Sequence, residues 1–71
     1  MAHVSSPYAA LAPEILAELR AYILVHGPGP LAKAAETSEH VVTRGAAGLP
    51  IRRASATVLR MALEAARERA A

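Results

Sequence analysis

The sequence predicts a small all-α domain of four to five helices in a chain of 71 residues. Hydrophobic residues make up 54% of the chain, and many of them are alanine, which has the highest helix propensity. Apolar side chains recur at helical spacing in two stretches, and glycine and proline separate these from shorter segments. There is no Phe or Trp, so the expected core depends on a few Leu, Ile and Val side chains, and a partner subunit would stabilise it.

The first predicted elements are an N-terminal arm over residues 1–11 and a helix that begins the domain over residues 12–71. Pro13 suits the first helical position because its missing N–H would be unpaired there. Apolar residues then recur at the spacing of a buried helix face up to about Val25, and Gly27 stops the helix. Within the arm, Val4, Tyr8 and Leu11 are candidates for contact with the domain.

Two short helices joined by a tight turn are predicted next. The first runs from about Gly29 to Ala35, and the turn is Glu36-Thr37. Ser38 caps the second helix, since its hydroxyl can accept a hydrogen bond from an unpaired backbone N–H. Gly48 ends this second helix. The last and longest helix runs from about Arg53 or Ala54 to Arg69 and carries an apolar stripe.

The second short helix has two different faces. Val42 is expected to point into the domain, whereas His40, Thr43 and Arg44 fall on the opposite side, with Glu39 at the edge. A short, polar, arginine-bearing helix after a capped turn is typical of the helix-turn-helix motif that reads DNA.

The charge distribution favours the same interpretation. The chain carries a net charge of +2. Residues 1–30 have a net charge of −1, while residues 31–71 carry Lys33 and six arginines against four glutamates, a net charge of +3. A basic half that contains the predicted DNA-reading helix would attract phosphate groups, although a solubilising basic surface is the simpler alternative.

The pattern Leu31-Ala32-x-x-Ala35-x-Thr37-Ser38-x-x-x-Val42-x-Arg44-x-x-x-Gly48 resembles the helix-turn-helix regulators of the phage-repressor/Cro type and the headpiece of lac-repressor-type regulators. The resemblance covers about residues 29–66 and implies a lambda-repressor-like fold. It also implies that Ser38 caps the reading helix or contacts a phosphate, and that Glu39, His40, Thr43 and Arg44 face the major groove. The chain departs from the family at the turn glycine, which is Glu36 here, and at Gly45, which is expected to make the end of the helix less rigid.

Each of these side chains has a candidate contact. Arg44 can bond both guanine acceptors, Thr43 can contact a phosphate or a thymine methyl group, and His40 can touch a base edge or a phosphate. Glu39 can accept from cytosine N4 or simply favour the helix dipole. The remaining cations are candidates for phosphate contacts or ordinary surface charges: Lys33, Arg52 and Arg53.

Other classes of protein are disfavoured. The chain has no Cys, and His3, His26 and His40 lack the spacing of metal ligands. It shows no catalytic constellation, no phosphate-binding glycine loop, no signal peptide and no membrane span. We therefore expect a cytoplasmic protein that is not an enzyme and that uses no cofactor, metal or small-molecule ligand.

The resulting hypothesis is a small sequence-specific repressor that binds double-stranded DNA as a homodimer and acts by occupying its operator. The expected dimer surface is either the last helix, through Leu59, Met61 and Leu63, or the first helix with Tyr8 and Tyr22. Two alternatives remain: a helical module that docks on a protein partner, such as a phage-type adaptor or inhibitor, and a nucleoid-associated protein that binds DNA without sequence specificity.

Overall fold

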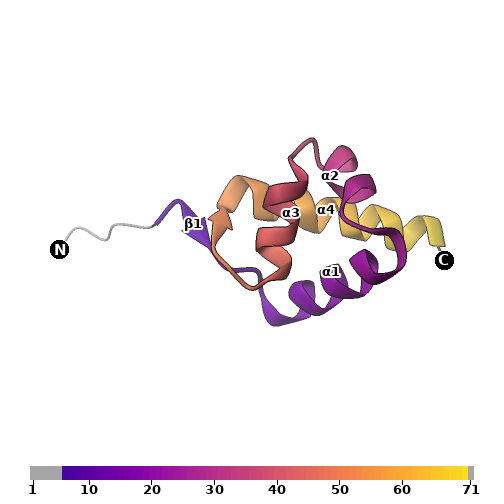
Figure 1. Cartoon of the computed structure of the whole chain (residues 1–71), viewed down its shortest axis with the longest axis horizontal. Coiled ribbons are helices and arrows are strands. Elements are labelled where there is room, and N and C mark those ends of the chain that lie inside the picture. The colour runs from indigo at the N-terminus through magenta and orange to yellow at the C-terminus, as the bar shows by residue number, and fades with distance from the viewer. Residues whose placement is uncertain (1–5, 71) are drawn as a thin grey trace.

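Four helices and a two-stranded sheet make up the structure, a computed structural model that describes residues 6–70 (Figure 1). In chain order the elements are β1 (Tyr8–Ala9), α1 (Pro13–His26), α2 (Gly29–Ala34), α3 (Glu39–Ala46), β2 (Ile51–Arg52) and α4 (Arg53–Ala70). The predicted helices are confirmed, with ends that differ by only one or two residues from those expected. The fold is mostly helical, and the small sheet was not anticipated.

The small sheet joins the N-terminal segment to the chain beyond α3. Tyr8 pairs with Arg52 and Ala9 with Ile51 in antiparallel register. The backbone N–H of Arg53 extends this pairing by donating a 2.9 Å hydrogen bond to the carbonyl of Pro7. The expected arm is therefore integrated into the domain from Tyr8 onward, while its first five residues, including Val4, lie outside the described residues.

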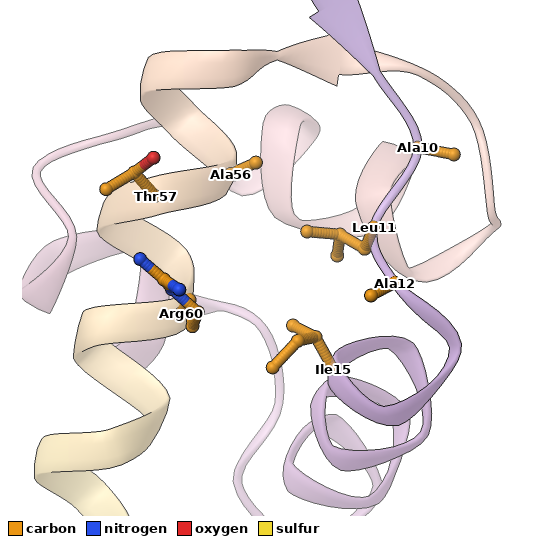
Figure 2. Close-up of a pocket in the computed structure, with 7 residues that line it drawn as sticks. All are labelled: Ala10, Leu11, Ala12, Ile15, Ala56, Thr57 and Arg60. Atoms are coloured by element: carbon orange, nitrogen blue, oxygen red, sulfur yellow. The ribbon is translucent and has the colours of Figure 1, made fainter.

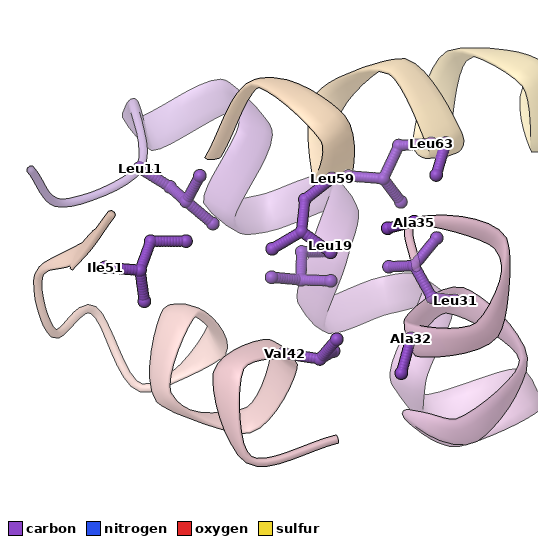
Figure 3. Close-up of a cluster of buried hydrophobic side chains, with 10 residues drawn as sticks. Leu11, Leu19, Leu31, Ala32, Ala35, Val42, Ile51, Leu59 and Leu63 are labelled. Carbon is purple, nitrogen blue, oxygen red and sulfur yellow. The ribbon is translucent and has the colours of Figure 1, made fainter. Parts of the chain in front are cut away.

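The core lies where α4 crosses the other three helices (Figure 3). Its fully buried side chains are Leu19, Leu31, Val42, Leu59 and Leu63. Leu11 and Ile51 close the end of the core that is nearest to the sheet, as Figure 3 shows. Every helix thus contributes at least one fully buried residue, which is how a chain without Phe or Trp assembles one continuous apolar cluster.

The turn between α2 and α3 is closed by backbone hydrogen bonds around Glu36. The N–H of Thr37 donates to the carbonyl of Ala32 over 2.9 Å, and Glu36 adopts a φ of 53°. This combination is the Schellman ending of a helix, in which a residue in the left-handed region reverses the chain. The family resembled by the sequence has glycine at this turn position, and here Glu36 adopts the conformation that glycine favours.

Both ends of α3 follow the local sequence signals. The Ser38 Oγ accepts a 3.2 Å hydrogen bond from the N–H of Val41, which confirms the predicted N-cap. At the other end Gly48 has a φ of 82°, and the N–H of Leu49 donates to the carbonyl of Arg44 over 3.2 Å. The start and the end of α3 are therefore determined by residues in its own vicinity.

Candidate nucleic-acid interface

The exposed face of α3 carries the four side chains singled out in the sequence. Glu39, His40, Thr43 and Arg44 are all exposed, whereas Val42 is fully buried. Residues that are three or four apart share one side of a helix, so this set forms one polar strip along α3. The predicted division between an outward polar face and an inward Val42 is confirmed.

Gly45 lets α3 approach the core closely. A Cβ atom at this position would lie 3.3 Å from Leu11 Cδ1 and 3.4 Å from Ile51 Cδ1. The sequence suggested that Gly45 loosens the end of α3. Instead it is a buried residue whose missing side chain makes room for two core side chains from β2 and the segment before α1.

Arg44 is held at the C-terminal end of α3. Its Nε donates a 2.9 Å hydrogen bond to the carbonyl of Pro50. Within residues 6–70, its two terminal nitrogens make no hydrogen bond to the protein. The guanidinium is thus anchored by one N–H, and its outer edge, which would carry the predicted contact to guanine, remains available to a ligand.

The hydroxyl of Thr43 is directed back to its own helix. It lies within donating distance of the carbonyls of Glu39, at 3.0 Å, and His40, at 3.1 Å. Because this interaction uses the only hydroxyl proton, Thr43 can donate to a phosphate only if its hydrogen bond to the helix backbone is broken. Its methyl group is unaffected, so the thymine contact is the more compatible of its two predicted roles.

Ser38 and Glu39 lie at the start of α3. The cap uses Ser38 Oγ as an acceptor, so the hydroxyl proton can still be donated to another group. Glu39 extends toward the start of α2, since a Cβ atom built on Gly29 would lie 3.7 Å from Glu39 Oε2. A carboxylate here is favoured by the partial positive charge at the first turn of α3, which agrees with the dipole role considered for Glu39.

Arg52 and Arg53 lie beside the N-terminal segment. The Arg53 Nε donates a 2.8 Å hydrogen bond to the carbonyl of Ser6, and the Arg52 guanidinium lies 5.9 Å from the centre of the Tyr8 ring. Both arginines are exposed, as is Lys33 on α2. Figure 1 shows α3 between α2 and the sheet, so these predicted phosphate contacts flank α3 on different sides.

Arg20 of α1 was not recognised in the sequence as a candidate. Its Nε donates a 2.7 Å hydrogen bond to the carbonyl of Ala46, the last residue of α3. An isolated arginine on an exposed helix face looks like any solvated charge, and no local sequence signal links it to a carbonyl 26 residues away. The structure therefore adds one cation to the neighbourhood of α3.

Two leucines of the expected dimer surface are unavailable for that role. Leu59 is fully buried and Leu63 is 2% exposed, so the prediction that they contact a second subunit is wrong. They face the core because α4 packs its apolar stripe against the other three helices. Met61, which is 58% exposed, remains on the surface of α4, and the other exposed apolar side chains of note are Leu24 and Val25 at the end of α1.

The surface hollows are small and open. One of about 250 Å³ lies between the start of α1 and the first turns of α4, where Ile15 and Leu11 face Ala56 and Arg60 (Figure 2). Thr57 and Arg60 are the two polar side chains in its lining. Over residues 6–70 there is no group of three side chains suited to hold a metal ion, and no helix is long and apolar enough to cross a membrane.

Compared with known proteins, the chain matches no family model, no curated protein and no solved structure at a significant level.

Proposed function

We propose that this protein binds double-stranded DNA in a sequence-specific manner, with α3 as the helix that enters the major groove. The single observation that carries the proposal is the two-sided nature of α3. Glu39, His40, Thr43 and Arg44 face solvent, while Val42 and Gly45 hold the helix against the core. A helix that is anchored on one side and polar on the other can present side chains to base edges without unfolding the domain.

The connection between α2 and α3 supports the proposal. Six residues of α2 are followed by a tight turn at Glu36 and a serine-capped α3, the order of elements in a lambda-repressor-like helix-turn-helix. In such motifs the first helix crosses the DNA backbone while the second lies in the groove. Lys33 on α2 and the pair Arg52-Arg53 then serve as phosphate contacts on either side of the groove.

A homodimer is part of this proposal. One short reading helix contacts only a few base pairs, so a second copy related by two-fold symmetry would double the recognised sequence. Its half-sites would lie about one helical turn, ~34 Å, apart. The dimer would act as a small repressor that occupies its operator and excludes other proteins from it.

The test is selection of bound duplexes from a random pool, followed by binding of the selected duplex and a scrambled duplex at one salt concentration. We expect the selected duplexes to share a motif with two-fold symmetry. We also expect the affinity for the selected duplex to be at least about a thousandfold higher than the affinity for the scrambled duplex. Equal affinity for both duplexes would instead favour the nucleoid-associated alternative, in which binding is sequence-blind. The variant His40→Ala combined with Thr43→Ala alters the strip and leaves every arginine in place, so it should weaken binding to the selected duplex more than binding to the scrambled duplex.

A helical protein-interaction module is the second candidate. The observation that favours it is the exposure of Leu24, at 88%, and Val25, at 76%, near the end of α1. Exposed apolar residues that lie side by side can mark a surface that another protein covers. Complete absence of salt-dependent binding to any duplex would support this candidate and overturn the DNA-binding proposal.

A further inference from the structure

Arg20 lies along the segment that ends α3. Its Nε bonds the carbonyl of Ala46 at 2.7 Å, and its Nη2 lies 3.9 Å from the position that a Cβ atom on Gly48 would occupy. The guanidinium therefore follows the chain from the last residue of α3 to the glycine that reverses it. Although α1 is remote from α3 in the sequence, this contact places a positive charge beside the end of the candidate reading helix.

Arg44 approaches the same segment with the same geometry. Its Nε bonds the carbonyl of Pro50, so Arg20 and Arg44 are attached to the two ends of residues 46–50, which comprise the last residue of α3 and the connector after it. In each case the bond uses Nε, and within the described residues neither arginine pairs its terminal nitrogens with a protein acceptor or a carboxylate. Each guanidinium thus keeps the four N–H groups of its two terminal nitrogens for a ligand.

Anchoring through Nε matters for the strength of binding. A flexible arginine loses rotamer freedom when it binds, and a side chain already held by the protein loses less. The planar outer edge of a guanidinium matches two oxygens of a phosphate group. The outer edge of the anchored Arg20 is therefore chemically suited to the phosphodiester backbone.

We propose that Arg20 is a phosphate-binding residue that contacts the DNA backbone beside the C-terminal end of α3, while Arg44 keeps its base-reading role. The inference rests on the proposed function, because it requires DNA to lie along α3. It assigns a role to a residue outside the helix-turn-helix segment. The contact is made to a phosphate, so it contributes to affinity for every sequence and carries no base preference.

The alternative role for Arg20 is purely structural. Its guanidinium bonds a carbonyl at the end of α3 and stabilises the negative end of the helix dipole, which would hold α3 to α1 without any DNA contact. This role predicts a loss of thermal stability on mutation with no change in the number of ions released on DNA binding. The two roles can therefore be separated by measuring both quantities.

The experiment measures duplex affinity against salt concentration for the wild type, Arg20→Ala, Arg20→Lys and Arg69→Ala, with the melting temperature of each. Arg69 is the matched control, an exposed arginine in the last turn of α4. For Arg20→Ala we expect the log–log salt slope to fall by about 0.9 and affinity at 0.1 M salt to fall roughly five- to tenfold for selected and scrambled duplexes alike. Arg20→Lys keeps the charge and should retain most of the slope, while Arg69→Ala should match the wild type.

Three results would overturn the inference. If Arg20→Ala keeps the wild-type slope, the residue is structural and the DNA-binding proposal stands without it. If Arg69→Ala lowers the slope as much as Arg20→Ala, the loss reflects the net charge of the protein and Arg20 makes no specific phosphate contact. If the wild type shows no salt-dependent binding, the inference and the proposed function fail together.

Discussion

Arg44 Nε donates a hydrogen bond of 2.9 Å to the carbonyl oxygen of Pro50, six residues later in the chain. This bond ties the candidate base-reading arginine to the connector that follows α3. It limits the directions in which the outer edge of the guanidinium can point, and an arginine of restricted direction discriminates better between base pairs than one that samples many rotamers.

The first prediction compares Arg44→Ala with Arg52→Ala. Loss of Arg44 should relax base preference at one position of each half-site, by about 1–3 kcal/mol of discrimination. Arg52→Ala should weaken binding to all sequences and lower the salt slope by about one unit. Both are measured by binding to the selected duplex and to single-base variants of it. Equal, sequence-blind losses in the two variants would contradict the role of α3 as a reading helix.

The second prediction concerns Glu36, whose φ is 53°. A non-glycine residue in the left-handed region costs about 1–2 kcal/mol. Glu36→Gly removes this cost, but glycine also gives the unfolded chain more conformational freedom, which offsets part of the gain. The free energy of unfolding should therefore rise by roughly 0.5–1 kcal/mol. Urea denaturation measures the change. Gly48→Ala, at a φ of 82°, is the opposite control and should lower stability by about 1 kcal/mol.

The third prediction tests the packing of Gly45. In Gly45→Ala the new Cβ meets the flexible ends of Leu11 and Ile51, at 3.3 and 3.4 Å. Those ends can shift, and alanine gains up to about 1 kcal/mol of helix propensity, so stability should stay within about 1 kcal/mol of the wild type. Gly45→Leu overfills the same space and should cost about 1–3 kcal/mol or more. If Gly45→Leu were as stable as the wild type by thermal unfolding, Gly45 would not be a packing residue.

The fourth prediction concerns the homodimer. Leu24 is the most exposed large apolar side chain among the described residues, at 88%, and Val25 beside it is 76% exposed. If the second copy covers this end of α1, Leu24→Glu should weaken dimerisation at least about tenfold in sedimentation equilibrium, because a buried unpaired charge is costly. Met61→Glu on α4 should leave the dimer intact, and neither change should alter the stability of the monomer. If Met61→Glu weakens dimerisation and Leu24→Glu does not, the dimer surface lies on α4 and not at the end of α1.

Two of the residues expected at the dimer surface, Leu59 and Leu63, lie in the core. Met61 and Leu63 both belong to an amphipathic helix, and its hydrophobic periodicity identifies the apolar stripe without identifying what covers it. In the folded chain the stripe faces α1, α2 and α3, so Leu59 and Leu63 are in the core and Met61 stays exposed. Only the arrangement of the four helices separates core residues from surface residues on this stripe.

The ends of the helices follow from local sequence signals. Pro13, Gly27, Ser38 and Gly48 act through bonds and conformational preferences within a few residues, so they can be read without knowing the fold. The same local periodicity placed Val42 inside and the polar strip of α3 outside. The pairing of Tyr8 with Arg52 was decided by the tertiary structure, because strands of two residues carry no pattern and exist only where a distant partner supplies their hydrogen bonds. The contact between Arg20 and Ala46 was decided in the same way: a side chain can bond a carbonyl 26 residues away only after packing has brought α1 against the end of α3.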